Sequence, residues 1–273
     1  MGVASKRAVL AALATAAVGS PVLLSAGGSP ARAATGDLYG SNTELYATPG
    51  LVEGTQYARR YRRHGVLDDH LTSDAGLPQV AVLAPHGGGI ETGTSELCLA
   101  VAGYHPATMA ATTDGRGLHD YWMFEGLLSS GNGDLHVTSV NCDDPWAESI
   151  CGGARHAVTL HGCTPEQAGE PAGTAAVLIG GLDGTLRELL RQEFVTVGIT
   201  VAQGSNDDID GTHPRNICNR TLSSTGAQLE LTTPLRNAMF GTNTRAGRKN
   251  TTEPLFWDFV SATRAALALR ASA

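Results

Sequence analysis

Basic residues are scarce in this chain. It contains 19 lysines and arginines against 26 aspartates and glutamates in 273 residues. Three of the basic residues lie in the first 33 positions, which contain no acidic residue, so the remaining chain has 16 basic and 26 acidic residues and a net charge of −10. Such an acidic chain lacks the electrostatic signature of a nucleic-acid-binding protein. It also repels anionic substrates in general, so an acidic substrate would need a local group of arginines.

Long apolar runs are absent after the N-terminal segment, so no other stretch of the sequence is long enough to cross a bilayer. Lys6 and Arg7 precede an alanine-rich apolar stretch at residues 8–24, and Ala31-Arg32-Ala33 has the form of a signal-peptidase site. The pattern predicts a secretory signal peptide at residues 1–33 and a secreted protein at residues 34–273. A membrane anchor is the alternative, which glycine and proline within the apolar stretch disfavour.

Internal repeats and low-complexity linkers are also absent, and the remaining chain of about 240 residues suits a single domain. Cysteines are few. Five of them in an exported chain allow up to two disulfides and one free thiol. Cys142 and Cys151 flank a short segment, and Cys98 belongs to the apolar pattern of a predicted helix. The spacing leaves the pairing open.

The most informative stretch starts with a short apolar run, residues 80–84, which is rich in β-branched residues and ends at Pro85. This pattern predicts a strand that is buried on both faces of a sheet. His86, three glycines and then Glu91 follow. In open α/β sheets, ligands bind at the carboxyl ends of the strands, so His86 and Glu91 are candidate metal ligands. The alternative is a glycine turn with a surface histidine and glutamate.

A second stretch repeats this design, because the strand predicted at residues 156–160 ends in His161-Gly162. Two histidines and one glutamate that leave a position open for water are typical of catalytic zinc sites. We therefore predict that His86, Glu91 and His161 bind Zn²⁺. His136 lies in another predicted strand, residues 135–140, and is interpreted as a structural histidine.

The alternation of strands with helices predicts an α/β fold, a single domain with a mixed, largely parallel sheet flanked by helices. Within it, the aromatic strand at residues 120–126 and the strand at 135–140 are separated by a turn and are predicted to form a hairpin. A helix capped by Thr94 or Ser95 follows the first glycine turn, and Glu96 on it is the main rival to Glu91 as a ligand.

A long polar loop at residues 204–221 is a candidate binding segment, since structureless loops of this length inside compact domains tend to be functional. Arg220 offers a planar fork for a carboxylate, and Asn216 and Asn219 offer neutral hydrogen-bonding groups. The next strand, at residues 226–232, alternates strictly.

Glu230 lies in that alternating strand among leucines. A buried glutamate is costly unless it faces a site or is paired, which makes Glu230 a candidate general base. The alternative is a structural carboxylate paired with Arg236, which follows the strand. In the first case Arg236 is available as a second arginine for a substrate carboxylate.

The chain resembles the poly-γ-glutamate hydrolase family, known from bacteriophages and bacteria and related in fold to zinc carboxypeptidases. The resemblance runs from about residue 44 to the C-terminus and rests on ordered motifs: His86-Gly-Gly-Gly-Ile-Glu91, Leu160-His161-Gly162, Asn216-Ile-Cys-Asn219-Arg220 and Gly226-Ala-Gln-Leu-Glu230. It implies a zinc carboxypeptidase-like fold. His86, Glu91 and His161 stand at the family's zinc-ligand positions, and Glu230 stands at the position of the general base.

Asn219-Arg220 looks like the pair with which carboxypeptidases grip a substrate carboxylate. In carboxypeptidases that pair precedes the last histidine ligand, whereas here it follows His161. The resemblance implies a secreted zinc amidohydrolase that cleaves γ-glutamyl bonds, most simply those of poly-γ-glutamate. Alternatives are a zinc amidase for another acidic amide, such as γ-glutamyl links of cell-wall peptide, and a non-catalytic extracellular binding domain. We expect a monomer that binds neither nucleic acid nor, after signal removal, a membrane.

Overall fold

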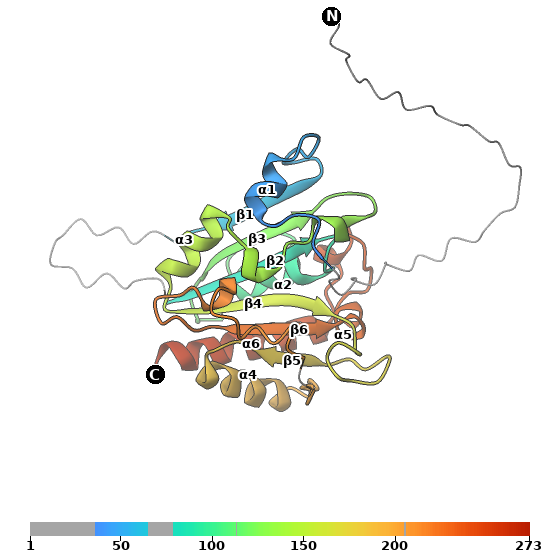
Figure 1. Ribbon diagram of the computed structural model, residues 1–273. Helices are drawn as coiled ribbons and strands as arrows, with labels where there is room; N and C mark the ends of the chain where they lie inside the picture. Colours follow the sequence, from blue (N-terminus) through green and yellow to red (C-terminus); the bar gives the residue numbers. More distant parts are fainter. Residues whose placement is uncertain (1–35, 65–78, 113, 205) are drawn as a thin grey trace, which may run out of the picture.

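A computed structural model describes residues 36–64, 79–112, 114–204 and 206–273 of the chain (Figure 1). The signal peptide predicted at residues 1–33 lies outside these ranges. None of the helices formed by the described residues combines the length and the apolar character that a bilayer span requires.

Six strands form one mixed sheet in the order β1-β3-β2-β4-β6-β5 (Figure 1). Their bounds are Tyr57–Arg62 for β1, Val80–Gly88 for β2, Asp120–Gly126 for β3, His156–Cys163 for β4, Val177–Gly180 for β5 and Ala227–Thr232 for β6. The inner strands β3, β2, β4 and β6 run parallel, whereas β1 and β5 pair antiparallel at the two edges. The predicted class, a single-domain α/β fold with a mixed, largely parallel sheet flanked by helices, is confirmed.

Helices cover both faces of this sheet. The α-helices are α1 Asn42–Ala47, α2 Thr94–Val101, α3 Pro145–Gly153, α4 Gly184–Thr196, α5 Thr233–Ala238 and α6 Pro254–Ala271. The larger core cluster joins one sheet face to α2, α4 and α6, and a second cluster joins the other face to α1 and α3. Strand β2 contributes Val80 and Val82 to the first cluster and Ala81 and Leu83 to the second. It is therefore buried on both faces, as its unbroken apolar run predicts.

Strand β2 continues past Pro85 to Gly88, four residues beyond the predicted end at Ala84, with a register shift between Ala84 and Gly87 against β3. Glycine is required there because the chain passes very close to its neighbours. A Cβ on Gly87 would lie 2.9 Å from the carbonyl oxygen of Phe124, and Gly88 has a φ of +67°. The close passage places His86 at the carboxyl end of the sheet.

The hairpin predicted from residues 120–126 and 135–140 is wrong. The first of these segments is β3, but the second is not a strand: short 3₁₀ turns occupy Asn132–Leu135 and Ser139–Asn141. The reason is topological, because β3 lies between β1 and β2 and offers no free edge to a hairpin partner. The segment containing His136 instead crosses the carboxyl edge of the sheet.

The disulfides expected from the cysteine count are also absent. All five cysteines lie in the described ranges, and all are buried free thiols. They pack as small apolar side chains, a common role for free cysteine. Cys98 on α2 belongs to the larger core cluster, as expected.

Candidate metal centre

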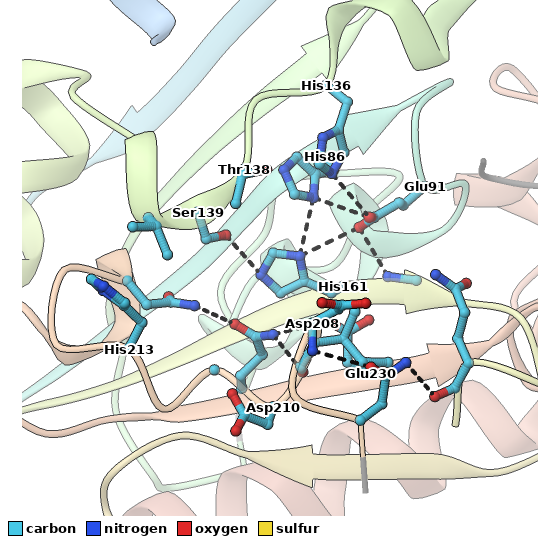
Figure 2. A pocket seen from close by; sticks show the side chains of 18 of the residues that line it. His86, Glu91, His136, Thr138, Ser139, His161, Asp208, Asp210, His213 and Glu230 are labelled. Atoms are coloured by element: carbon cyan, nitrogen blue, oxygen red, sulfur yellow. Dashed lines mark hydrogen bonds and ion pairs between the residues drawn. The ribbon is translucent and has the colours of Figure 1, made fainter. Parts of the chain in front are cut away.

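The carboxyl ends of three adjacent parallel strands, β2, β4 and β6, meet at one edge of the sheet. His86 lies near the end of β2, and His161 on β4 is in register with Glu230 on β6. Glu91 follows β2 after the glycine turn, where its N–H donates to the His86 carbonyl oxygen over 2.8 Å. Figure 2 shows His86, Glu91 and His161 pointing toward one another, with Glu230 on the neighbouring strand.

The three predicted metal ligands are in close contact and almost fully buried. Glu91 Oε1 lies 3.0 Å from His86 Nδ1, and Glu91 Oε2 lies 3.6 Å from His161 Nδ1. Glu91 Oε2 also accepts the N–H of Gly162 over 2.9 Å. Burial raises the pKa of Glu91, but the neighbouring His86 and His161 outweigh it and hold this pKa well below its usual range. The carboxylate is therefore ionised and available to a cation.

Contacts with the protein hold the Nε2 atom of each histidine. His86 Nε2 lies 2.9 Å from the carbonyl oxygen of Val137, which can only accept, so the proton belongs on Nε2. His161 Nε2 lies 3.3 Å from Ser139 Oγ. The two Nδ1 atoms lie 3.1 Å apart, an arrangement that a shared cation stabilises when neither nitrogen carries a proton. Two imidazole nitrogens with a carboxylate suit zinc.

His136, interpreted from the sequence as structural, belongs to the same cluster. His86, Glu91 and His136 each offer one possible ligand atom, and these three atoms lie within 4.8 Å of one another. The His136 ring tilts against that of His86 with ring centroids 3.8 Å apart, and its Nδ1 lies 2.7 Å from Asp37 Oδ1. Burial raises the pKa of Asp37, but hydrogen bonds from His136 and Thr138 lower it to about 2. The sequence signal was the histidine itself, which the mistaken strand prediction placed away from the site.

Glu230 is buried, with 4% of its surface exposed, and lines the same cavity as the three histidines. Its Oε1 accepts a hydrogen bond from Gln228 over 2.9 Å. Burial, and then repulsion from the Glu91 carboxylate, raise the pKa of Glu230 well above its usual range. A carboxyl group with a raised pKa next to a candidate metal site is suited to proton transfer near neutral pH.

The residues predicted to grip a substrate carboxylate do not converge on the cavity. Arg220 forms an ion pair with Glu148 over 2.6 Å and donates to the carbonyl oxygens of Arg215 and Val140. Asn219 donates to the carbonyl oxygens of Gly211 and His213 and accepts the N–H groups of Leu182 and Gly226. Their polar groups thus fold the loop onto the body of the protein, and neither residue lines the cavity.

Arg236 and Glu96 also form their polar contacts outside the cavity. The Arg236 guanidinium donates to the carbonyl oxygens of Leu231 and Thr92, so it ties α5 to the turn after Glu91 and does not line the cavity. Glu96 forms a buried ion pair with Arg248 over 3.0 Å, which removes it as a rival ligand. Asn216 does line the cavity, where its side chain donates to Gln228 over 2.8 Å.

The cavity holds about 380 Å³ and is acidic. Its lining contains four histidines and five carboxylates but, among the described residues, neither arginine nor lysine. Three of the carboxylates, Asp207, Asp208 and Asp210, come from the polar loop that the sequence marks as functional. Figure 2 shows Asp208 and Asp210 on the side of the cavity near Glu230. The arginine cluster expected for an acidic substrate is therefore not part of this lining.

The contacts of Arg220 yield a prediction. Changing Arg220 to lysine is expected to leave KM for an acidic γ-glutamyl substrate within about twofold, because the guanidinium faces Glu148 and main-chain carbonyls. The variant should instead lose about 1 kcal/mol in free energy of unfolding, the value of a few part-exposed polar contacts. Steady-state kinetics and urea unfolding check both parts. A tenfold rise in KM at unchanged stability would restore Arg220 as a substrate-binding residue.

Comparisons with known proteins agree on one family. The sequence model of the poly-gamma-glutamate hydrolases matches residues 68–262. The SPbeta prophage-derived UPF0714 protein YoqZ of Bacillus subtilis (strain 168) is 32% identical over 192 residues, which are 70% of this chain but only 62% of that relative. A solved bacteriophage poly-gamma-glutamate hydrolase is 29% identical, with a TM-score of 0.70 over 86% of this chain and 98% of its own. A zinc-free apo structure of YndL is 27% identical, with a TM-score of 0.63 over 83% and 95%.

Proposed function

Because the chain belongs to the poly-γ-glutamate hydrolase family, we propose that it cleaves γ-glutamyl amide bonds, foremost those of poly-γ-glutamate, with one bound zinc ion. One observation carries the proposal: His86, Glu91 and His161 place ligand atoms 3.0 to 3.6 Å apart beside the buried Glu230. The related bacteriophage protein is a poly-gamma-glutamate hydrolase, and the apo form of YndL is described as zinc-free. Membership of a family of hydrolases also argues against the alternative that the chain is a non-catalytic binding domain.

His86 Nδ1, His161 Nδ1 and the Glu91 carboxylate would hold the zinc ion. When bound, zinc polarises a scissile carbonyl and acidifies the attacking water.

A short hydrogen-bond chain positions Glu230, the candidate general base. Asn216 donates to Gln228 Oε1 over 2.8 Å, and Gln228 donates to Glu230 Oε1 over 2.9 Å. Gln228 Nε2 also donates to the carbonyl oxygen of Ile209. Asn216, expected from the sequence to bind substrate, therefore supports the general base in this proposal.

Metal content and product analysis test the proposal together. The purified protein is expected to contain close to one zinc per chain and to shorten poly-γ-glutamate, as chain-length analysis by gel or size-exclusion chromatography would show. A protein that binds no zinc, or that binds zinc and leaves γ-glutamyl polymer and short γ-glutamyl peptides intact, would contradict it.

The acidic cavity makes cleavage of a polyanion depend on salt. Poly-γ-glutamate carries a carboxylate on each residue and meets Asp207, Asp208 and Asp210 at the cavity, so the two repel each other. Raising the salt from about 10 mM to about 100 mM shortens the Debye length from about 30 to about 10 Å and is expected to raise kcat/KM severalfold. Initial rates on polymer at several salt concentrations measure the effect.

Two controls sharpen this experiment. The Asp208→Asn variant, which alters an exposed loop carboxylate, should show a smaller salt effect than the wild type. An uncharged γ-glutamyl amide analogue should show less dependence than the polymer. A kcat/KM for polymer that falls with salt would instead indicate a cationic surface that attracts the substrate.

The same cavity supports a second candidate substrate. Since its lining has neither arginine nor lysine among the described residues, it favours a less highly charged γ-glutamyl amide, such as a γ-glutamyl link in cell-wall peptide. Comparing kcat/KM for polymer and for short γ-glutamyl peptides at one salt concentration separates the two substrates.

Export and a monomeric state belong to the same proposal. The charged and apolar pattern of residues 1–33 supports export, with the mature chain beginning near Ala34. Amino-terminal sequencing of protein recovered from culture medium and light scattering test these two points.

A further inference from the structure

Two residues 99 positions apart in the sequence, Asp37 and His136, meet at the rim of the metal centre. Asp37 Oδ1 lies 2.7 Å from His136 Nδ1, and Asp37 Oδ2 accepts the N–H of Thr138 over 2.6 Å. The Asp37 side chain is only 9% exposed. Both oxygens of this nearly buried carboxylate are therefore hydrogen-bonded to the segment that contains His136.

This contact fixes which nitrogen of His136 is free. A carboxylate only accepts, so Nδ1 carries the proton and Nε2 keeps its lone pair. Nε2 lies 4.0 Å from Glu91 Oε1, on the cavity side of the ring. Figure 2 shows His136 alongside His86 and directed toward Glu91.

The segment 136–139 orients all three imidazoles of the centre. Its Val137 carbonyl oxygen takes the Nε2 proton of His86, its Ser139 hydroxyl contacts His161 Nε2, and His136 contributes its own ring. Each histidine thus has one nitrogen tied to the protein and the other turned toward Glu91. Because His136 is oriented toward Glu91 in the same way as the two predicted ligands, the same role in metal binding is indicated for it.

A similar pair elsewhere in the molecule shows what a purely structural pair looks like. His64 Nδ1 lies 2.9 Å from Asp120 Oδ1, and its ring is about as exposed as that of His136. There the second nitrogen bonds to the hydroxyl of Tyr104, so neither nitrogen is left for a ligand. The Nε2 atom of His136 faces the metal cluster instead.

We propose that His136 is a further ligand of the metal and that Asp37 is the positioning residue that holds it in place. The inference rests on the proposed zinc site and adds to it a fourth protein donor, which zinc accommodates by expanding its coordination. A carboxylate that hydrogen-bonds a ligating imidazole fixes its tautomer and increases its basicity. Metal affinity would then depend on a residue at the start of the described chain.

The experiment measures zinc affinity by competition with a chromophoric chelator, together with the visible spectrum of the cobalt(II)-substituted protein. Asp37→Asn is expected to weaken zinc binding by about 10- to 100-fold, the usual cost of losing such a partner. His136→Ala should weaken it at least as much and change the cobalt spectrum, since a nitrogen donor is lost. The matched control, Asp120→Asn, should leave zinc affinity within about twofold while lowering the melting temperature.

A double variant separates positioning from general stability. If Asp37 acts through His136, Asp37→Asn has no further effect on zinc affinity once His136 is alanine. An equal loss in that background, or a His136→Ala protein with wild-type zinc affinity and an unchanged cobalt spectrum, would overturn the inference. Wild-type protein without any zinc affinity would overturn the zinc site as well, whereas normal zinc binding in all variants overturns this inference alone.

Discussion

Changing Glu230 to glutamine is expected to lower turnover by at least about 100-fold while fold and zinc content stay intact. Glutamine keeps the size of the side chain and an oxygen that accepts the hydrogen bond from Gln228, but it cannot take a proton from water. Steady-state rates per zinc-loaded molecule measure the loss.

The stability of this variant follows from the raised pKa of Glu230. Because burial favours the protonated carboxyl in the fold, ionisation of Glu230 destabilises the metal-free protein as the pH rises above the value for an unfolded glutamate, about 4.3. Glutamine stays neutral and removes this contribution. The melting temperature of the metal-free Glu230→Gln variant should therefore equal or exceed that of the wild type at neutral pH.

Glu96→Gln is the matched control for a buried glutamate outside the cavity. It breaks the ion pair with Arg248, so it should lower the melting temperature and leave turnover per folded molecule nearly unchanged. A zinc-loaded Glu230→Gln protein with full activity would show that another group acts as the base. A lower melting temperature at an intact rate would return Glu230 to a structural role, although Arg236 bonds to main-chain oxygens and threonine hydroxyls.

Changing His161 to alanine is expected to have the largest effect on the metal. The substitution removes the nitrogen that lies 3.1 Å from His86 Nδ1, and zinc affinity should fall by more than about 100-fold, beyond the cost of losing an indirect partner. Zinc per chain after gel filtration should drop from close to one to a small fraction, and activity should fall with it. Glu91→Gln is expected to behave in the same way, because it removes the negative charge.

His156 provides the control, since it lies at the opposite end of the same strand and is equally buried. His156→Ala should lower the melting temperature through its contact with Asp183 and leave the zinc content at the wild-type value. If both variants kept their zinc, the centre would have to be built from other residues.

Much of the centre could be predicted because its parts carry local patterns. An apolar run buried on both faces marks an inner strand, and parallel inner strands end at the same sheet edge, so His86 and His161 had to lie near each other. Strict alternation turned Glu230 away from its leucine neighbours, and the register pairs it with His161. These inferences depend on contacts between residues close in sequence and on one general rule of sheet topology.

The remaining parts depend on which distant segments pack together, and short-range patterns carry no information about that. Arg220 has the right chemistry for a carboxylate, but loop packing brings Glu148 within 2.6 Å of it. The segment around His136 has the sequence pattern of a strand, but β1 and β2 occupy both edges of β3 and leave no edge for it to pair with. Asp37 meets His136 across 99 residues, and no short-range pattern indicates that the chain's first described residues lie beside the candidate metal centre.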